Sequence, residues 1–336
     1  MKARMWTIRF AVGVLVVFGL VVLGEPYFLS EAFAQEKVSM RFQWKVGSEH
    51  AGFIVAKEKG FYQQEGLDVT LKEGMGLGST GVLKLIGAKE ETFGLVALNT
   101  SLKGVVNGVP VIQVMVIQLT SNGILLRPDS GIKTPQDLVG KSIAGSGSGV
   151  SDVFVAFLGI NNVPVDQVKY VAGGSAYLQT MVAGRSHGAL ANVLNDMNEV
   201  KKMGMKEVNS LLFTDWGVPP DSYGIAVHTD TIGQNPETIR KFVRASLKGI
   251  KAMLANIEEA ADISKKHFPM VDRDGLLANL RNLKGFEKQI IPETLGWQNP
   301  KAVEGIRDMA AKYDKLPQAK DMPPSKFFTN DFLPKN

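Results

Sequence analysis

The chain has 336 residues, no cysteine, and 38 basic against 33 acidic side chains, which gives a formal net charge of +5. Without cysteine it has no disulfide bonds, so an exported form must be held together by its hydrophobic core. The small basic excess is spread along the chain without a dense basic run, which argues against nucleic acid as a partner.

The first 34 residues have the pattern of a secretory signal peptide. Met1 to Arg9 carries three basic residues, Phe10 to Gly24 has no charge, and AFA (32–34) places small residues before Gln35. This pattern predicts cleavage after Ala34 and a periplasmic location. An uncleaved membrane anchor is the alternative, although the fifteen-residue apolar stretch is shorter than the roughly 18 residues of a spanning helix.

From Val38 onward, short apolar runs alternate with helical segments. We expect strands at residues 38–46, 67–73, 92–98 and 110–118, and helices at 50–66, 79–89 and 99–108. In the first strand Met40, Phe42 and Trp44 share one face, and Asn99 is expected to cap the third helix. Alternation at this spacing predicts βαβ units and a mainly parallel sheet.

The alternation then repeats. We expect helices or helical turns at 132–140, 150–162 and 175–184, and strands at 141–145, 167–173, 187–192 and 222–228. Thr134 with Pro135 predicts a helix start, as does Asn235 with Pro236 before a long helix over 235–256. That helix has an apolar stripe and a basic face, which we interpret as solvated, with a docking surface as the alternative.

This order of elements predicts two α/β lobes and a helical C-terminal part. We place the first lobe at 35–122, the second at 123–222, and a return crossover with helices packed mainly on the first lobe at 223–336. Only TSNGILLRPDSG (120–131) joins the lobes. Two lobes without a flexible tether suggest a hinge with a ligand cleft between them.

Each predicted lobe has a glycine-rich loop before a helix. GLGSTG (76–81) matches GxGxxG, but it follows the second strand and lacks the acid about 20 residues on that a dinucleotide site needs. We expect a polar nest of backbone N–H groups with the Ser79 and Thr80 hydroxyls. In AGSGSGVSD (144–152), Ser146 and Ser148 precede a helix N-terminus that attracts polar groups, with a flexible turn as the alternative.

Catalytic and metal-binding patterns are missing from the sequence. The four histidines lie far apart, with no HExxH motif, so no metal or cofactor site is predicted. Nothing in the sequence supports a nucleophile–base pair such as Ser146 with His50. His50 begins a helix, where it can line a cleft or cap the helix, and Glu49 suits the first turn of that helix. Asn192 follows a strand and suits a polar ligand or a helix N-cap.

Two stretches resemble the signatures of a known family: FQWKVGSEHAGFIVAKEKGFYQQEGLDVTL (42–71) and SGIKTPQDLVGKSIA (130–144). The family comprises the periplasmic binding proteins for nitrate, sulfonates, taurine and thiamine pyrimidine precursors. The resemblance extends from about Val38 to Val227. It implies a two-lobe type II clamshell that acts as a monomer and delivers a small molecule to an ABC permease, without catalysis.

The resemblance also implies which positions line the cleft. In this sequence they are Trp44, His50, Ser79, Thr80, Asn99, Ser146, Ser148, Asn192 and Tyr223. Trp44 is expected to form a flat apolar wall, and the glycine/serine loops are expected to supply hydrogen bonds.

The ligand class is open between two chemistries. A sulfonate, nitrate or carboxylate would use the helix N-termini and often an arginine fork, for which Arg127 and Arg185 are candidates. A neutral heteroaromatic such as a pyrimidine would use Trp44, Tyr223 and Asn192. We favour the organic anion. Fungal pyrimidine synthases resemble the family but carry a cysteine-rich motif, so the missing cysteines favour a transporter or sensor subunit over an enzyme.

Overall fold

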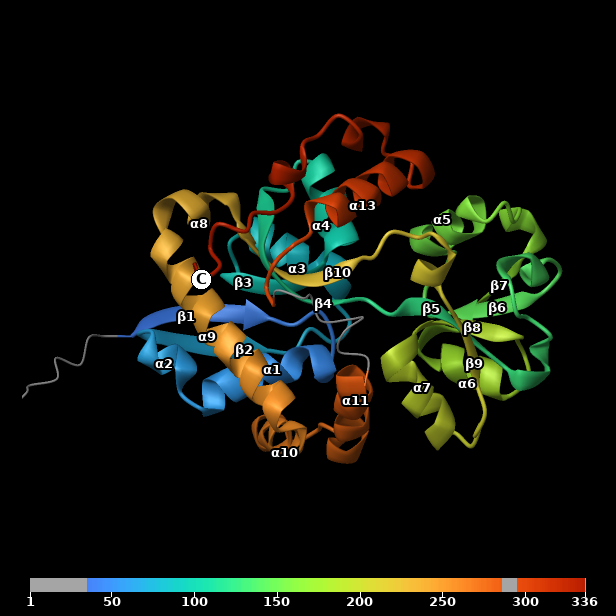
Figure 1. Ribbon diagram of the computed structural model, residues 1–336, viewed down its shortest axis with the longest axis horizontal. Coiled ribbons are helices and arrows are strands. Elements are labelled where there is room, and N and C mark those ends of the chain that lie inside the picture. The colour runs from blue at the N-terminus through green and yellow to red at the C-terminus, as the bar shows by residue number, and fades with distance from the viewer. Residues whose placement is uncertain (1–34, 286–294, 336) are drawn as a thin grey trace, which may run out of the picture. The chain divides into compact units, whose positions relative to one another are not determined.

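Two five-stranded sheets organise the protein (Figure 1). The computed structural model describes residues 35–285 and 295–335, so the predicted signal peptide lies outside the described residues. The described residues belong to one compact unit that starts at Gln35. Within these residues, no helix is both long enough and apolar enough to span a membrane.

The strand order is β2-β1-β3-β10-β4 in the first sheet and β7-β6-β8-β5-β9 in the second. The first sheet contains β1 (Glu36–Arg41), β2 (Leu67–Lys72), β3 (Phe93–Ala97), β4 (Val111–Leu119) and β10 (Ser222–His228). The second contains β5 (Asn122–Leu126), β6 (Ser142–Gly145), β7 (Lys169–Ala172), β8 (Gly188–Asn192) and β9 (Asn209–Leu212). Only β10 and β5 run against their neighbours, so each sheet is mainly parallel, as predicted.

The reversed strand of each sheet is the one that the chain enters from the other sheet. β4 continues through Thr120 and Ser121 into β5, and β9 continues through residues 213–221 into β10. The two crossovers touch, because the Thr120 N–H donates to the Asp221 carbonyl oxygen over 2.9 Å. Each sheet is therefore completed by a strand that arrives through this meeting point.

The sequence did not predict β5 or β9. The Asn122-Gly123 pair that opens β5 has the composition of a turn. In the structure Gly123 lies inside the sheet, where a Cβ would sit 2.4 Å from the Leu211 carbonyl oxygen of β9. This glycine is required by a close approach of two strands, and a close approach of distant residues is not visible in the local sequence.

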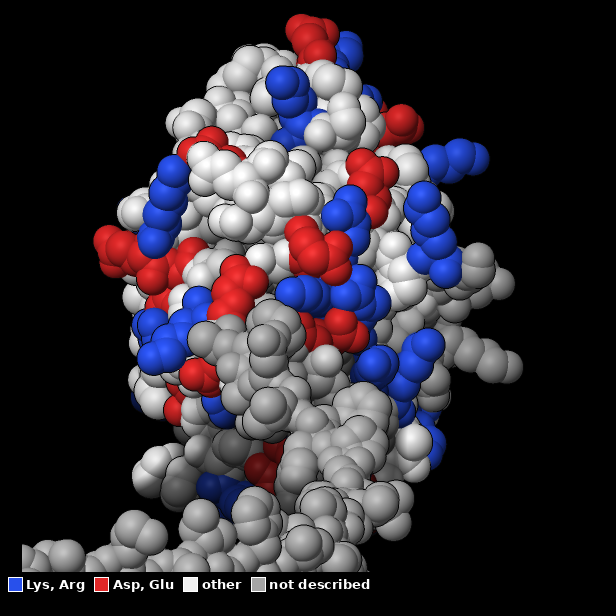
Figure 2. Space-filling model, turned by 90° about the vertical axis from the view of Figure 1, so that its left-hand side faces the viewer, with Lys and Arg blue, Asp and Glu red and all other residues white. Residues whose placement is uncertain are grey.

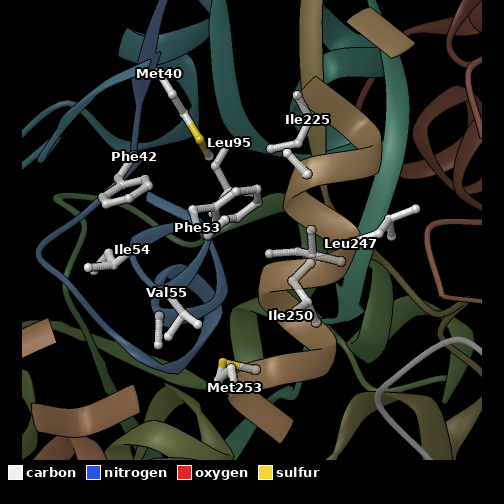
Figure 3. Packing of buried hydrophobic residues seen from close by; sticks show 14 of the residues in the cluster. Met40, Phe42, Phe53, Ile54, Val55, Leu95, Ile225, Leu247, Ile250 and Met253 are labelled. Carbon is white, nitrogen blue, oxygen red and sulfur yellow. The ribbon is translucent and has the colours of Figure 1, made fainter. Parts of the chain in front are cut away.

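Helices cover both faces of the first sheet. α1 (Ser48–Glu58), α9 (Pro236–Ala255) and α10 (Ile257–His267) bury one face, and α3 (Gly78–Gly87) and α4 (Leu98–Val106) cover the other. α1 and α9 pack so closely that a Cβ on Gly52 would lie 2.9 Å from the Cα of Ile250. Figure 3 shows the core between them, with Phe53 and Val55 of α1 on one side and Ile250 and Met253 of α9 on the other.

The second sheet is also covered on both faces. α5 (Asp152–Ile160) packs on one face, and α6 (Tyr177–Val182) and α7 (Val193–Lys202) pack on the other. The predicted helix start at Thr134 and Pro135 is confirmed by a helical turn at Pro135–Leu138 with Thr134 as N-cap. Two C-terminal helices reach this layer: α11 (Arg273–Gly285) contacts α7, and α13 (Pro300–Tyr313) contacts both α4 and α5.

Two local predictions were wrong. β1 ends at Arg41, so Trp44 lies outside the strand and does not share a face with Phe42. Phe42 is buried, whereas Trp44 is 49% exposed. After β1 the chain runs beside the loop that follows β2, where the Gly74 N–H donates to the Trp44 carbonyl oxygen over 3.2 Å. The N-cap of α4 is Ala97, not Asn99. The first turn of α4 is capped instead by the Asp221 carboxylate, which accepts from the Asn99 N–H over 3.1 Å.

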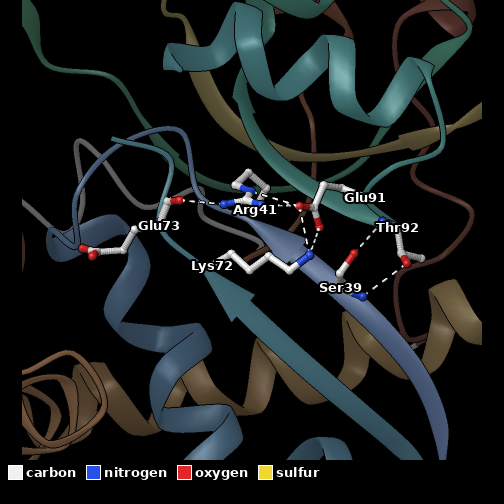
Figure 4. A network of polar contacts seen from close by, with 6 residues as sticks. All are labelled: Ser39, Arg41, Lys72, Glu73, Glu91 and Thr92. Carbon is white, nitrogen blue, oxygen red and sulfur yellow. Dashed lines mark hydrogen bonds and ion pairs between the residues drawn. The ribbon is translucent and has the colours of Figure 1, made fainter. Parts of the chain in front are cut away.

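A buried ionic network fixes the ends of β1 and β2 (Figure 4). The Glu91 side chain, only 3% exposed, accepts hydrogen bonds from Arg41 over 2.6 Å and from Lys72 over 3.2 Å. Burial acts to raise the pKa of Glu91, but hydrogen bonds from Ser39, Arg41 and Lys72 outweigh burial and lower that pKa. These contacts hold the ends of β1 and β2 together at the point where the two loops that follow them begin.

The basic face of α9 is partly paired with acidic residues. Arg244 contacts Glu65 and Glu237, and Lys248 contacts Glu65. Figure 2 shows acidic and basic side chains interspersed over one face of the molecule. Such mixing is typical of a solvated surface.

Candidate functional site

Polar side chains from both sheets meet where β8 ends and β10 begins. Glu49 lies in the first turn of α1 and Tyr223 near the start of β10. Asn192 caps α7, Asp196 lies in the first turn of that helix, and Tyr177 begins α6. We call these five residues the acidic site. Ligands of open α/β folds bind at strand ends of this kind.

Asp196 is the best-connected carboxylate of the acidic site. Its Oδ2 accepts a hydrogen bond from the Tyr177 hydroxyl over 2.8 Å and from the Asn192 N–H over 2.9 Å. Burial raises the pKa of Asp196 to about 6, and the nearby carboxylates of Glu199 and Glu49 also raise it. The side chain can therefore take up a proton close to neutral pH.

The acidic site has a negative electrostatic character. Burial raises the pKa of the Tyr223 hydroxyl, and the charged groups that add to this effect are Glu49, Asp221 and Asp196. Within the described residues, no group of three or more His, Asp or Glu side chains is arranged to hold a metal ion.

A chain of hydrogen bonds leads from the start of α1 to Glu49. The Gly47 N–H donates to His50 Nδ1 over 2.8 Å, so His50 Nε2 carries the proton and donates to Gln43 Oε1 over 2.9 Å. The Gln43 amide in turn donates to Glu49 Oε1 over 3.3 Å. Burial lowers the pKa of His50, opposed by Glu49 and Glu73, so the imidazole is neutral.

His50 is completely buried, with both ring nitrogens used by the protein. It therefore holds Glu49 in place through Gln43 and has no exposed atom that could contact a ligand. Of the two roles expected of Asn192, the structure shows the N-cap, because the Asn192 side chain caps α7. Its Oδ1 also accepts from the Ser121 hydroxyl over 2.6 Å at the edge of the acidic site. Tyr223, half-buried, is the other sequence-predicted residue in the acidic site.

Ser79 and Thr80 lie in the first turn of α3, and Ser146 and Ser148 lie in the loop after β6. The Ser79 hydroxyl accepts from the Ala97 N–H over 3.1 Å and thus ties the start of α3 to β3. Thr80, Ser146 and Ser148 are exposed. Tyr170 braces the second glycine/serine loop, because its hydroxyl donates to the Gly147 carbonyl oxygen over 2.8 Å.

Asn99 lines a small cavity where the two crossovers touch. Asp221, Thr120, Asn122 and Ile306 of α13 also line it. The cavity has room for about one water molecule. Burial raises the pKa of Asp221 to about 6 against the lowering effect of three backbone N–H groups. Its Oδ2 has no hydrogen-bond partner within the described residues.

The sequence did not single out Tyr177 or Asp221 as site residues, and it assigned Glu49 only to the helix dipole. One signal was present: Glu49 and Asp196 each stand in the first turn of a helix that follows a strand. That these two helix starts face the same site depends on the crossovers, which bring the two sheets together.

A family model described as NMT1/THI5 like matches residues 47–260. The riboflavin-binding protein RibY of Chloroflexus aurantiacus is 28% identical, over 79% of this chain and 74% of that protein. The formylaminopyrimidine-binding protein of Halalkalibacterium halodurans is 23% identical, over 72% of this chain and 75% of that protein. A 4-amino-5-hydroxymethyl-2-methylpyrimidine phosphate synthase of Legionella pneumophila is 22% identical, over 89% and 93% of the two chains.

The fold is also that of solved binding proteins. The periplasmic aliphatic sulphonate binding protein SsuA of Escherichia coli superimposes with a TM-score of 0.67, at 13% identity over 84% of this chain and 88% of that chain. This confirms the predicted fold class, a periplasmic-binding-protein arrangement of two α/β sheets with a helical C-terminal region.

Proposed function

Since the chain belongs to the NMT1/THI5-like family, as its sequence signatures suggested, we propose that it is the solute-binding subunit of an ABC importer and that its ligand is a neutral nitrogen heteroaromatic. Two relatives support the ligand class by their names: riboflavin and formylaminopyrimidine both contain a pyrimidine ring. The protein acts in the periplasm, after cleavage behind Ala34, and delivers the ligand to the permease.

The negative charge of the acidic site is the observation on which the choice of a neutral ligand rests. Glu49, Asp221 and Asp196 all add to the raised pKa of the Tyr223 hydroxyl, so the charged groups that act on it are negative. An anion would meet carboxylates on both sides, which costs free energy in a partly buried site. The sequence-based preference for a sulfonate, nitrate or carboxylate ligand is therefore replaced by its alternative. A heteroaromatic ring with N–H groups suits carboxylate and amide acceptors.

Binding follows from hinge motion. The ligand enters between the lobes while they are open, and closure brings Glu49 and Tyr223 of one lobe against Asn192 and Asp196 of the other. The hinge consists of the touching crossovers, Thr120–Ser121 and residues 213–221. Trp44 stays available as an apolar wall at the mouth, since half of its surface is exposed. Ligand binding then shifts an open–closed equilibrium, without chemistry.

A thermal-shift screen of the purified protein tests the ligand class. Riboflavin, formylaminopyrimidine and related aminopyrimidines should raise the melting temperature, because a ligand at 100 times its Kd adds about 2.7 kcal/mol of stability. Taurine, alkanesulfonates and nitrate should not. Asp196→Asn should weaken the response, and the matched exposed control Asp166→Asn should not. A shift with the anions alone, or turnover of any bound heterocycle, would overturn the proposal.

A further inference from the structure

We propose that Glu49 recognises an N–H group of the ligand, and that Gln43 and His50 are positioning residues that hold its carboxylate for this contact. The inference rests on the proposed function and deepens it, because it names the chemical group by which the site selects its heterocycle. It concerns one oxygen atom, Glu49 Oε2.

Glu49 Oε2 lacks a donor in a buried setting. The Glu49 side chain is only 8% exposed, and Oε2 has no hydrogen-bond partner within the described residues. A buried carboxylate oxygen without a donor is costly, and charged acceptors form strong hydrogen bonds. A donor supplied by the ligand would satisfy it.

The carboxylate of Glu49 is near groups that come from both sheets. It acts on the pKa of Asp196, which α7 carries, and on the pKa of Tyr223, which β10 carries. A ring that contacts Tyr223 and Asp196 therefore also lies within the electrostatic reach of Glu49. This location separates Glu49 from ordinary first-turn acids, which face solvent.

Every other polar atom of the Glu49 support is already paired. The Gly47 N–H fixes the His50 tautomer, His50 Nε2 donates to Gln43, and Gln43 donates to Glu49 Oε1. The chain of donors ends at Oε1, and Oε2 of the same carboxylate is left without a donor from the described residues. Gly47 leaves room for this arrangement, because a Cβ there would lie 2.7 Å from Oε2.

The ligand implied is a heterocycle with a ring N–H or an exocyclic amino group. Replacing the N–H hydrogen with a methyl group removes the donor and keeps the ring. Two pairs of probes isolate this contact: riboflavin with 3-methylriboflavin, and 4-amino-2-methylpyrimidine with its 4-dimethylamino analogue.

The experiment measures Kd for both members of each pair by titration calorimetry, with the wild type and with Glu49→Gln. A hydrogen bond to a charged group predicts that the wild type binds the N–H member about 10–100-fold more tightly. Glu49→Gln should lose most of this preference, because one of its two acceptor atoms becomes a donor. The Kd of the methylated member should change by less than about threefold.

Glu199→Gln is the matched control. Glu199 also raises the pKa of Asp196, so this variant removes an equal charge near the site without touching Oε2. Its N–H preference should equal that of the wild type. If Glu199→Gln loses the preference as Glu49→Gln does, Glu49 contributes only general negative charge and the inference is wrong.

The positioning role is tested by two variants of His50. In His50→Gln the amide nitrogen can replace Nε2 as the donor to Gln43, whereas in His50→Asn the shorter side chain can only replace Nδ1 beside Gly47. His50→Gln should keep the N–H preference and His50→Asn should lose it. Because the preference is a ratio of two Kd values, loss of stability alone does not change it. Equal preference in both variants overturns the positioning role.

The outcomes also separate the two proposals. A wild type that binds both members of a pair equally well overturns the role of Glu49 and leaves the proposed function intact. A wild type that binds neither pair, nor any heterocycle of the thermal-shift screen, overturns the proposed function and this inference with it.

Discussion

The helices of the two sheets meet along two seams of opposite character. In the apolar seam, α13 packs on α4 and α5, and Leu98, Phe157 and Ile306 from these helices belong to one continuous buried cluster. In the polar seam, α7 meets α11 and α1 through hydrogen bonds: Asn198 to Asn279 over 2.8 Å, Asn282 to the Leu194 carbonyl oxygen over 3.1 Å, and Ser48 to Asn195 over 3.2 Å.

The difference indicates which seam opens. Separating the apolar seam would expose buried side chains to water, at a cost that grows with apolar area. Separating the polar seam exchanges hydrogen bonds within the protein for hydrogen bonds to water, which changes the free energy little. The acidic site includes α1 and α7, which the polar seam joins, so we expect ligand to enter on that side while the apolar seam stays closed.

The largest effect is expected in the apolar seam. Ile306→Ala should lower the free energy of unfolding by about 2–5 kcal/mol, because it leaves a cavity among side chains from three helices. Urea denaturation measures this loss. Val139→Ala, at a position 47% exposed, should stay within about 0.5 kcal/mol of the wild type. A loss below about 1 kcal/mol for Ile306→Ala would show that the apolar seam is loosely packed.

Lys103 is the ionic element of the apolar seam. It contacts Asp314, whose side chain is 2% exposed, over 2.9 Å, and it also contacts Asp152. Lys103→Met should cost about 2–3 kcal/mol at pH 7, because it leaves a buried carboxylate without its cation. Burial already raises the pKa of Asp314, so the cost should shrink as protonation begins at lower pH. Adding Asp314→Asn to Lys103→Met should restore stability in urea titrations, and failure to restore it would contradict this explanation.

Asp221 lies between the seams, where the crossovers touch. Its pKa in the folded protein, about 6, is above the ordinary value of 3.8, so ionisation at neutral pH opposes folding. Asp221→Asn should therefore add about 1–3 kcal/mol of stability at pH 7. The gain should disappear as the pH falls from 6 toward 4, because the wild-type carboxyl then takes up its proton. Unfolding free energies at pH 7 and 4.5 check this, and a gain that is the same at both pH values would be inconsistent with it.

The smallest effect on stability is expected in the polar seam. Asn279→Ala should change the free energy of unfolding by less than about 1 kcal/mol, because Asn198 can bind water instead. It should nevertheless weaken ligand binding by about two- to fivefold, since fewer molecules are closed. Small-angle X-ray scattering of the ligand-free protein should show a larger radius of gyration. Asn198→Ala should weaken ligand binding to the same extent, and the double variant should bind no more weakly than either single variant. If Asn279→Ala instead strongly lowers the free energy of unfolding, the polar seam does not open.

The sequence by itself determined most of the elements and the fold class, because strand and helix periodicities and helix starts such as Thr134-Pro135 are local properties. Hydrophobic alternation also identified β10 as a strand, but only pairing with β3 and β4 shows that it returns to the first sheet. The sequence predicted Asn192, after a strand, and Tyr223, near the return crossover, as ligand-binding residues, and the structure brings both into the acidic site.

Tertiary structure decided the rest, for reasons that act over long distances in the chain. Asp221 caps α4 from the other crossover, so Asn99 is not needed as a cap. Trp44 leaves the first strand because its loop bonds to Gly74. His50 is a residue type that often binds ligands, and the sequence predicted it in the cleft. In the structure it is completely buried, and its two hydrogen bonds within the protein help to hold Glu49 through Gln43. Glu49 and Asp221 are more than 170 residues apart in the chain, and Asp196 lies between them. The site becomes negative only when folding brings these three carboxylates close to Tyr223.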